Sequence, residues 1–167
     1  MPEILRRYFL RKKERKSLLQ KVSETLGMDT EQVFGSKPQI EVIETGRHRI
    51  FVANGLAIFA KSKDGLFPTL FFRDSFPLLP EIIVNMGAVP HICNGADVMV
   101  PGIVEMLGDF KEDDLVLVLD ERNKRPIAIT RSFFNSESAK TLRKGRVLKN
   151  LHHVGDDIWK TIKATQP

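Results

Sequence analysis

Apolar side chains in the first thirty residues recur with the period of a helix. Leu18, Val22 and Leu26 stand at every fourth position, and the residues between them are mostly polar or charged. This spacing gathers an apolar stripe that can face a core while the other positions stay in water. Gly27 follows at once and suits the left-handed conformation that commonly ends a helix. The pattern predicts an amphipathic helix that ends at Leu26.

Short β-prone runs separated by turn signals follow as far as residue 72. Asn54-Gly55 and Asp64-Gly65 are typical of tight hairpin turns, because these residues accept positive φ angles. The runs cover residues 40–43, 49–52, 56–59 and 67–72. With the preceding helix they predict an α+β unit. The proline-containing segment 76–80 disfavours regular structure, so we place the boundary there, between an N-terminal domain of residues 1–76 and a C-terminal domain of residues 77–167.

The C-terminal domain alternates apolar runs of strand length with brief helical segments. Residues 115–119 and 126–130 are nearly continuous apolar runs, which predicts strands buried on both faces, as in a small closed barrel. Further strands are expected at 82–84, 98–100 and 146–148, and short helices at 87–94 and 136–142. The predicted fold is an α+β domain followed by a mixed β-barrel with short helices.

Composition places the chain among ordinary globular proteins that work inside the cell. Of its 167 residues 42% are apolar and 28% charged, and no apolar stretch approaches the roughly 18 residues of a membrane-spanning helix. The first twenty residues carry too much charge for a secretory signal. Cys93 is the single cysteine, so neither an internal disulfide nor a cysteine-based zinc site is expected. We expect a cytoplasmic protein with no membrane partner.

The positive charge of the chain is concentrated in two segments. Residues 1–21 hold eight Lys and Arg against two Glu, whereas the whole chain has a net charge of only +5. A second basic segment, residues 140–149, holds five cations and no acid, and the stretch 105–121 between them is acidic. This asymmetry favours a partner covered in phosphate, either RNA or an anionic membrane surface, over a small neutral substrate. The alternative is that these charges only keep the surface solvated.

No group of residues points to catalysis or to a bound cofactor. His152, His153, Asp156 and Asp157 have metal-ligand chemistry, but adjacent histidines on a strand point to opposite faces of the sheet. Neither the phosphate-binding loop of nucleotide hydrolases nor the glycine pattern of dinucleotide-binding proteins occurs. We therefore expect a protein without enzyme activity, metal or cofactor.

The segment from Gly87 to Ile103, GAVPHICNGADVMVPGI, resembles the signature of the PUA domain, an RNA-binding module of pseudouridine synthases and archaeosine transglycosylases. Later segments follow in that family's order. Residues 109–116 resemble the turn that enters its central strand, 126–129 the next strand, and 144–147 its closing strand. The resemblance covers roughly half of the chain and implies a barrel that binds RNA.

A narrower resemblance lies in the N-terminal domain, at the junction and in the tail. Phe67-Pro68-Thr69-Leu70, the segment 76–80 and Trp159 are similar to the malignant-T-cell-amplified-sequence family of translation factors and its archaeal relatives. Members of that family join a pre-PUA domain to a PUA domain. The resemblance implies a role in translation initiation or ribosome recycling. Its implied partners are tRNA at its 3′ end or rRNA, the small ribosomal subunit, and a protein similar to the density-regulated protein.

Several kinds of side chain in the PUA-like segment and after it suit a single-stranded RNA end. Small residues let the RNA come close, polar groups read base edges, apolar groups offer contact surface, and cations neutralise phosphates. The alternative for the glycines is a structural role at a helix end and in a turn. The expected RNA-binding residues are Asn94, Gly95, Ala96, Asp97, Met99, Pro101, Gly102, Arg143, Lys144, Arg146 and His152.

Two further functions stay open from the sequence alone. In the first, the chain is an accessory subunit that delivers tRNA or rRNA to a modifying enzyme. In the second, it is an adaptor whose basic faces bind acidic proteins. Co-purification separates these from a translation protein, because each hypothesis names a different companion.

Overall fold

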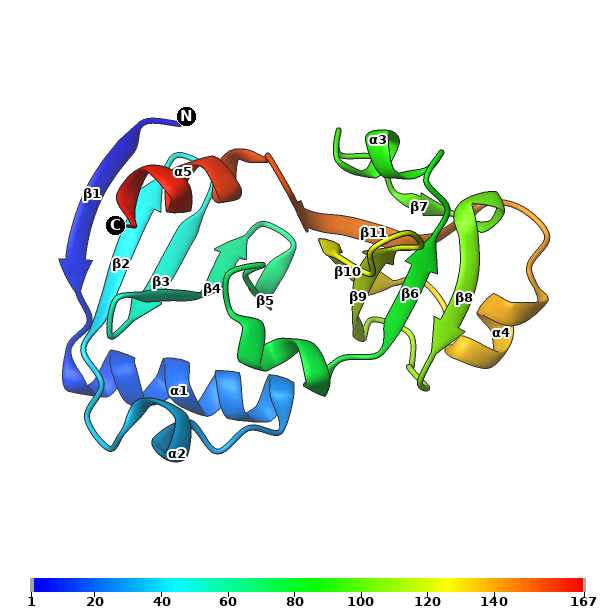
Figure 1. The fold of residues 1–167 in the computed structure, drawn as a ribbon. Coiled ribbons are helices and arrows are strands. Elements are labelled where there is room, and N and C mark those ends of the chain that lie inside the picture. The colour runs from blue at the N-terminus through cyan, green and yellow to red at the C-terminus, as the bar shows by residue number, and fades with distance from the viewer. Residues whose placement is uncertain (1, 167) are drawn as a thin grey trace. The chain divides into compact units, whose positions relative to one another are not determined.

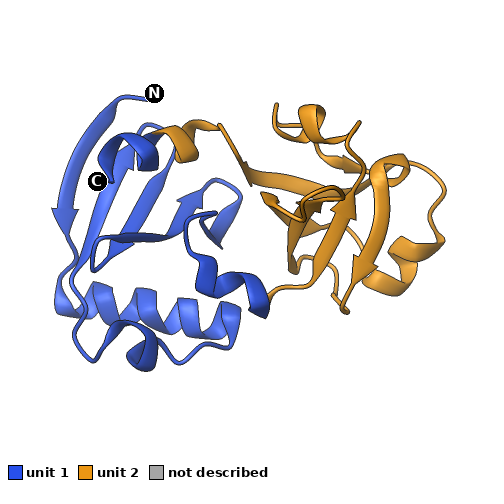
Figure 2. Cartoon of the chain, viewed as in Figure 1, with its two compact units in different colours: residues 1–78, 161–167 blue, residues 79–160 orange. Residues whose placement is uncertain are grey.

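The structure is a computed structural model that describes residues 2–166, and the chain forms two compact units in it. Unit 1 holds the residues up to 78 together with those from 161 onward, and unit 2 holds residues 79–160 (Figure 2). Within the described residues, every helix is too short or too polar to cross a membrane. The α+β unit followed by a mixed β unit agrees with the predicted fold class.

Unit 1 is built on a five-stranded antiparallel sheet whose spatial order follows the chain (Figure 1). The turn between the third and fourth strands is the predicted Asn-Gly hairpin, since Asn54 has φ 50° and Gly55 has φ 84°. A left-handed conformation at two successive residues matches the twist of the flanking strands. The strands are β1 (Ile4–Phe9), β2 (Ile40–Thr45), β3 (Arg49–Ala53), β4 (Leu56–Ser62) and β5 (Gly65–Pro68).

Two helices, α1 (Lys12–Leu26) and α2 (Thr30–Phe34), contact each other and lie beside this sheet (Figure 1). The residues of α1 that are buried are Leu18, Val22 and Leu26, and Gly27 ends the helix with φ 66°. The predicted apolar stripe and the predicted helix end are therefore confirmed. Phe34 of α2 lies 5.6 Å from the ring of Phe72 and continues the apolar core of unit 1.

Three segments of unit 1 differ from the predicted elements. Residues 4–9 form an edge strand that the sequence did not predict, with Leu5 and Phe9 exposed. The run 67–72 leaves the sheet after Pro68 and continues as a turn. The junction is not irregular throughout, because Arg73–Leu78 forms a short 3-10 helix, η1, which contains Pro77.

Unit 2 contains a six-stranded mixed sheet with the order β7-β11-β10-β9-β6-β8. Its edge strands β7 and β8 are separated in the sequence by only three residues, the 3-10 turn η2 (Val100–Gly102). The sheet must therefore curl until its two edges meet, which gives the barrel-like shape predicted from the sequence (Figure 1). The strands are β6 (Glu81–Val84), β7 (Val98–Met99), β8 (Ile103–Leu107), β9 (Leu115–Asp120), β10 (Pro126–Ser132) and β11 (Arg146–His153).

The core of unit 2 lies inside this curled sheet. All six residues of β9 are buried, which confirms the prediction of a strand covered on both faces. Val84, Val118 and Leu148 are among the fully buried side chains that pack together there. Two short helices, α3 (Val89–Ile92) and α4 (Ser136–Thr141), lie at the predicted places. The tail helix α5 (Asp157–Thr165) begins in unit 2, and its residues from Thr161 onward belong to unit 1.

Candidate functional site

A cleft of about 440 Å³ opens in unit 2 beside α3. It lies where α3, the loop to β7 and the turn η2 meet, so the residues before and after β7 face one another across it. Pro90 is the second residue of α3, in the first turn, where a backbone N–H has no partner within the helix and its absence breaks no hydrogen bond. Gly95 has φ 97°, so the loop that follows α3 turns sharply back toward β7.

Gly102 forms part of the cleft wall, at a position where the neighbouring Ala88 leaves little room for a side chain. A Cβ built on Gly102 would lie 2.9 Å from the Cβ of Ala88, well inside ordinary carbon contact. Asn85 ties the same two segments together: its Oδ1 accepts a hydrogen bond from the Ala88 N–H at 2.9 Å, and its own N–H donates to the Gly102 carbonyl at 2.9 Å. The wall is thus preorganised by backbone contacts.

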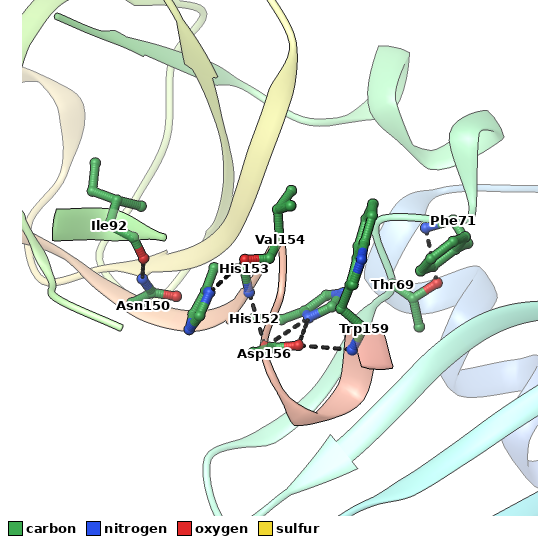
Figure 3. Close-up of polar contacts among 9 residues, drawn as sticks. All are labelled: Thr69, Phe71, Ile92, Asn150, His152, His153, Val154, Asp156 and Trp159. Atoms are coloured by element: carbon green, nitrogen blue, oxygen red, sulfur yellow. Dashed lines mark hydrogen bonds and ion pairs between the residues drawn. The ribbon is translucent and has the colours of Figure 1, made fainter. Parts of the chain in front are cut away.

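Asn150 of β11 holds the opposite side of the cleft. Its Nδ2 donates to the carbonyl of Ile92 at 3.0 Å (Figure 3). The same Nδ2 donates to the carbonyl of Ala96 at 2.9 Å, and the backbone N–H of Asn150 donates to Asp97 Oδ1 at 2.9 Å. The second Asp97 oxygen accepts from Arg146 at 3.2 Å. Asp97 therefore positions the loop and the cation, and its carboxylate is already engaged before any ligand arrives.

Five of the predicted RNA-binding residues line the cleft together. They combine small, apolar and acidic groups, and Met99 is 46% exposed beside them. Asn94 and Gly95 lie on the exposed loop just outside the lining. Arg146 is opposite Met99 in the β7–β11 ladder. The lining residues that the sequence predicted are Ala96, Asp97, Met99, Pro101 and Gly102.

The predicted cations Arg143 and Lys144 are exposed on the loop that leads into β11. That loop lies beside the cleft, because the Val100 N–H donates to the Gly145 carbonyl at 2.9 Å. Arg146 also lies over the ring of Phe133, 5.3 Å from its centroid, which holds the guanidinium in one place. The cations therefore border the cleft and do not line it.

His152 does not belong to this surface, contrary to the prediction. Its side chain is fully buried, so it offers no atom to RNA. Its Nδ1 lies 2.9 Å from Asp156 Oδ2, and Asp156 also accepts from the N–H groups of His153 and Trp159 (Figure 3). Burial raises the pKa of Asp156, but the hydrogen bond and attraction to His152, together with the hydrogen bonds from the Trp159 and His153 N–H groups, outweigh burial and hold that pKa below the ordinary value. The group is structural.

The sequence reasoning missed two sets of residues at the cleft. Asn85 and His91 both line it, and His91 is exposed there on α3. The turn between β9 and β10 adds exposed cations nearby, because Glu121 Oε1 accepts from the Met86 N–H at 3.1 Å and so ties this turn to the segment that carries Asn85. These cations are Arg122, Lys124 and Arg125.

The cleft can bind a strand whose backbone is anionic. Its walls are low, since alanine, proline and glycine form much of the rim, and its inner surface is largely apolar. Cations stand on the two bordering loops, and among the described residues the lining itself contains no lysine or arginine. Such an arrangement accepts an unstacked base between two phosphates better than it accepts a compact charged metabolite.

Family models match both units of the chain. The PUA domain matches residues 80–154, which include the cleft, and a domain of unknown function, DUF1947, matches residues 6–72. The fold and the site thus define a protein with a PUA domain at its C-terminal side, as the signature predicted.

A relative covers nearly the whole chain. The uncharacterized protein MJ1432 of Methanocaldococcus jannaschii is 37% identical over 158 residues, which are 94% of this chain and 97% of that protein. The chain therefore belongs to the family of proteins that pair DUF1947 with a PUA domain. Translation machinery-associated protein 20 of Saccharomyces cerevisiae is 26% identical over 77% of this chain and 76% of its own length. Malignant T-cell-amplified sequence 1 of Rattus norvegicus is 26% identical over 77% and 74%.

Two solved structures are similar to this chain over almost its full length. A hypothetical protein from Pyrococcus horikoshii OT3 is 31% identical with a TM-score of 0.77 and covers 94% of this chain and 99% of that one. A PUA-domain structure from Aeropyrum pernix K1, a tartrate complex, is 25% identical with a TM-score of 0.81, over 95% and 91%. The predicted resemblance to PUA-domain proteins is confirmed.

Proposed function

We propose that this protein binds RNA without catalysing a reaction, and that the unit 2 cleft holds a single-stranded RNA end. The observation that carries this proposal is the pairing of an apolar, low-walled cleft with cations on both bordering loops. Small residues let the sugar-phosphate backbone approach, and the cations meet phosphates on either side of an unstacked base. The PUA match over these residues supports the same ligand.

We further propose that the RNA is tRNA or rRNA and that the protein acts in translation. The support is the similarity to translation machinery-associated protein 20, whose name places that relative with the translation machinery. A role in initiation or ribosome recycling would bring the chain to the small ribosomal subunit in the cytoplasm. A protein similar to the density-regulated protein is the partner that the family resemblance suggests.

Salt-dependent binding tests the RNA surface. The cleft-border variant Arg143→Gln/Lys144→Gln/Arg146→Gln removes three charges next to the cleft. The control variant Lys12→Gln/Lys16→Gln/Lys63→Gln removes three exposed charges in unit 1. Each lost phosphate contact lowers the slope of log affinity against log salt concentration by about 0.7 on single-stranded RNA. The slope should therefore fall by roughly 2 in the first variant and be unchanged in the second. Equal binding by the two variants would refute the placement.

Co-purification tests the biological role. The tagged chain is expressed in its native cell, and the retained RNA and proteins are sequenced at moderate salt. Small-subunit rRNA or tRNA, together with initiation or recycling factors, is the expected result. Recovery of an RNA-modifying enzyme instead would reject the translation role and leave the RNA-binding cleft as proposed.

A further inference from the structure

A second cleft lies in unit 1, between α1 and strands β3 to β5, and its volume is about 480 Å³. Its floor is apolar and its inner side chains are well packed. Leu18 of α1 is 6% exposed and Phe51 of β3 is 8% exposed, while Leu10 and Leu66 are half-buried at the sides. The cleft has the size of an ordinary small-ligand pocket, and every residue that lines it belongs to one unit.

Four cations surround this apolar floor. Lys13 and Lys21 come from α1, Arg49 from β3 and Lys61 from β4. Within residues 2–166 none of the three lysines forms an ion pair, whereas Arg49 donates to Glu44 Oε1 at 3.3 Å. The one carboxylate among the lining residues is Glu14, and its Oε1 accepts the Arg11 N–H at the start of α1. The cleft is therefore strongly positive.

The cations are placed where they oppose folding. Arg49 and Lys61 are directly opposite in the β3–β4 ladder, and like charges at such positions repel. Glu44 offsets only part of this repulsion, because the same carboxylate also accepts from Arg6. Lys13 lies in the first turn of α1, where the helix dipole disfavours cations. The last turn, where the dipole favours cations, contains no basic residue. Glu44 beside Arg49 and Glu14 in the first turn of α1 offset these costs only in part.

The chemistry of the free cations indicates phosphate as the ligand group. Carboxylates are best met by the planar fork of arginine, and the one arginine of the cleft, Arg49, already donates its Nε to Glu44 at 3.3 Å. Most of the cleft's positive charge therefore comes from three lysine ammoniums, which act as point charges and suit phosphates in any orientation. The apolar floor between the lysines suits a ligand that also carries a planar, weakly polar group. A nucleotide of an RNA loop supplies both parts.

We propose that the unit 1 cleft is a second RNA site that takes one unpaired nucleotide of a structured RNA. The base enters against Leu18 and Phe51, and the flanking phosphates meet Lys13 and Lys21 on one side and Lys61 on the other. This site is separate from the unit 2 cleft and rests on the proposed function only for the choice of RNA among phosphate-bearing ligands.

The test uses the full chain and a designed RNA hairpin with a loop of seven uridines. The unit 1 cleft variant is Lys13→Gln/Lys21→Gln/Lys61→Gln. The matched control is again Lys12→Gln/Lys16→Gln/Lys63→Gln, which removes the same charge from α1 and from the turn that follows β4, outside the cleft. Affinity is measured as a function of salt, and ultraviolet cross-links to the loop are mapped to peptides by mass spectrometry.

The expected result is a 10- to 100-fold weaker affinity at about 0.1 M salt, with a salt slope smaller by roughly 2, in the cleft variant but not in the control. Cross-links to residues 10–21 and 49–66 disappear with it, while those to the unit 2 cleft persist. Cleft and control variants that bind equally would overturn the inference. So would an acidic peptide of glutamates that displaces the hairpin from this cleft, because it would indicate a protein partner.

The same map separates this inference from the proposed function. Cross-links confined to residues 85–102 and 143–146 would reject the unit 1 site and keep the unit 2 site. Cross-links confined to residues 10–21 and 49–66 would keep the unit 1 site and reject the unit 2 site.

Discussion

Replacing Gly102 by alanine tests whether the unit 2 cleft is preorganised by close backbone packing. The added Cβ would lie 2.9 Å from Ala88 Cβ, whereas carbon atoms in contact prefer about 3.5 to 4.0 Å. The two segments must therefore separate by roughly half an ångström or more. That movement stretches the hydrogen bonds through which Asn85 joins Ala88 to Gly102.

The expected loss of stability follows from two opposing effects. Overpacking of this kind costs about 1–3 kcal/mol. The loss of glycine's freedom in the unfolded chain returns about 0.4–1 kcal/mol. Gly102→Ala should therefore lower the free energy of unfolding of unit 2 by about 1–2 kcal/mol. Gly46→Ala is the matched control, because a Cβ there meets no described atom within 4 Å, and its effect should stay within about 0.5 kcal/mol.

Urea unfolding followed by circular dichroism measures both variants and completes a double-mutant cycle with Ala88→Gly. Ala88 Cβ is the atom that a Cβ at position 102 would meet, so its removal should relieve the contact. The coupling free energy between the two positions should be about 1–2 kcal/mol in the favourable direction. A Gly102→Ala variant as stable as Gly46→Ala, or a coupling near zero, would refute the close packing of this wall.

Three shorter predictions follow from other contacts. Lys61→Glu should raise the free energy of unfolding by about 0.2–1 kcal/mol in urea titrations, because it replaces a like-charge pair opposite Arg49 with an attractive one. Asp156 has a lowered pKa, so the stability it contributes is present above its unfolded value of about 3.9 and is lost as the pH falls through the folded value. Unfolding measured from pH 6 to 2.5 should therefore be less pH-dependent in Asp156→Asn than in the wild type, and equal slopes would contradict this. Arg122→Gln/Arg125→Gln should lower the salt slope of RNA binding by about 1.4, measured by fluorescence anisotropy, if the β9–β10 turn meets phosphates.

The elements that the sequence predicted correctly are those with local causes. The hairpin at Asn54-Gly55 forms because both residues adopt left-handed conformations that few other residues accept. The end of α1 at Gly27 has the same kind of cause. The strand β9 was visible because burial on both faces requires an unbroken apolar run.

The missed strands are edges of their sheets. β1 and β8 expose most of their side chains, including Leu5 at 61% and Val104 at 54%, so neither shows the alternation of a half-buried strand. Their conformation comes from pairing with β2 and β6, which lies outside any local window. The conformation of such segments is therefore determined by a strand that is distant in the sequence.

The error at His152 has a similar origin. β11 pairs Asn150 with Thr130 but His152 with Ile129, so Leu151 is an extra residue in the strand. Such a bulge shifts the pairing of the strand, and it leaves no mark in the sequence from which the burial of His152 could be predicted.

The candidate site could be predicted only as far as it is contiguous. Ala96 to Gly102 form one stretch of chain, and the PUA-like signature identified it. The cations at 122–125 join the cleft through the parallel pairing of β6 with β9, which sets Val84 opposite Asp120. A parallel pairing between distant strands has no sequence signal of its own, so these cations were missed.

The account depends most on the claim that an RNA end occupies the unit 2 cleft. Amide chemical shifts of the full chain, measured by nuclear magnetic resonance, test it with two single-stranded RNAs of one sequence, a linear form with a free 3′ end and a closed circle. Shifts at Ala96, Met99 and Gly102 that saturate with the linear RNA and stay small with the circle are the predicted result. Shifts that avoid these three amides, or that both RNAs cause equally, would contradict the claim.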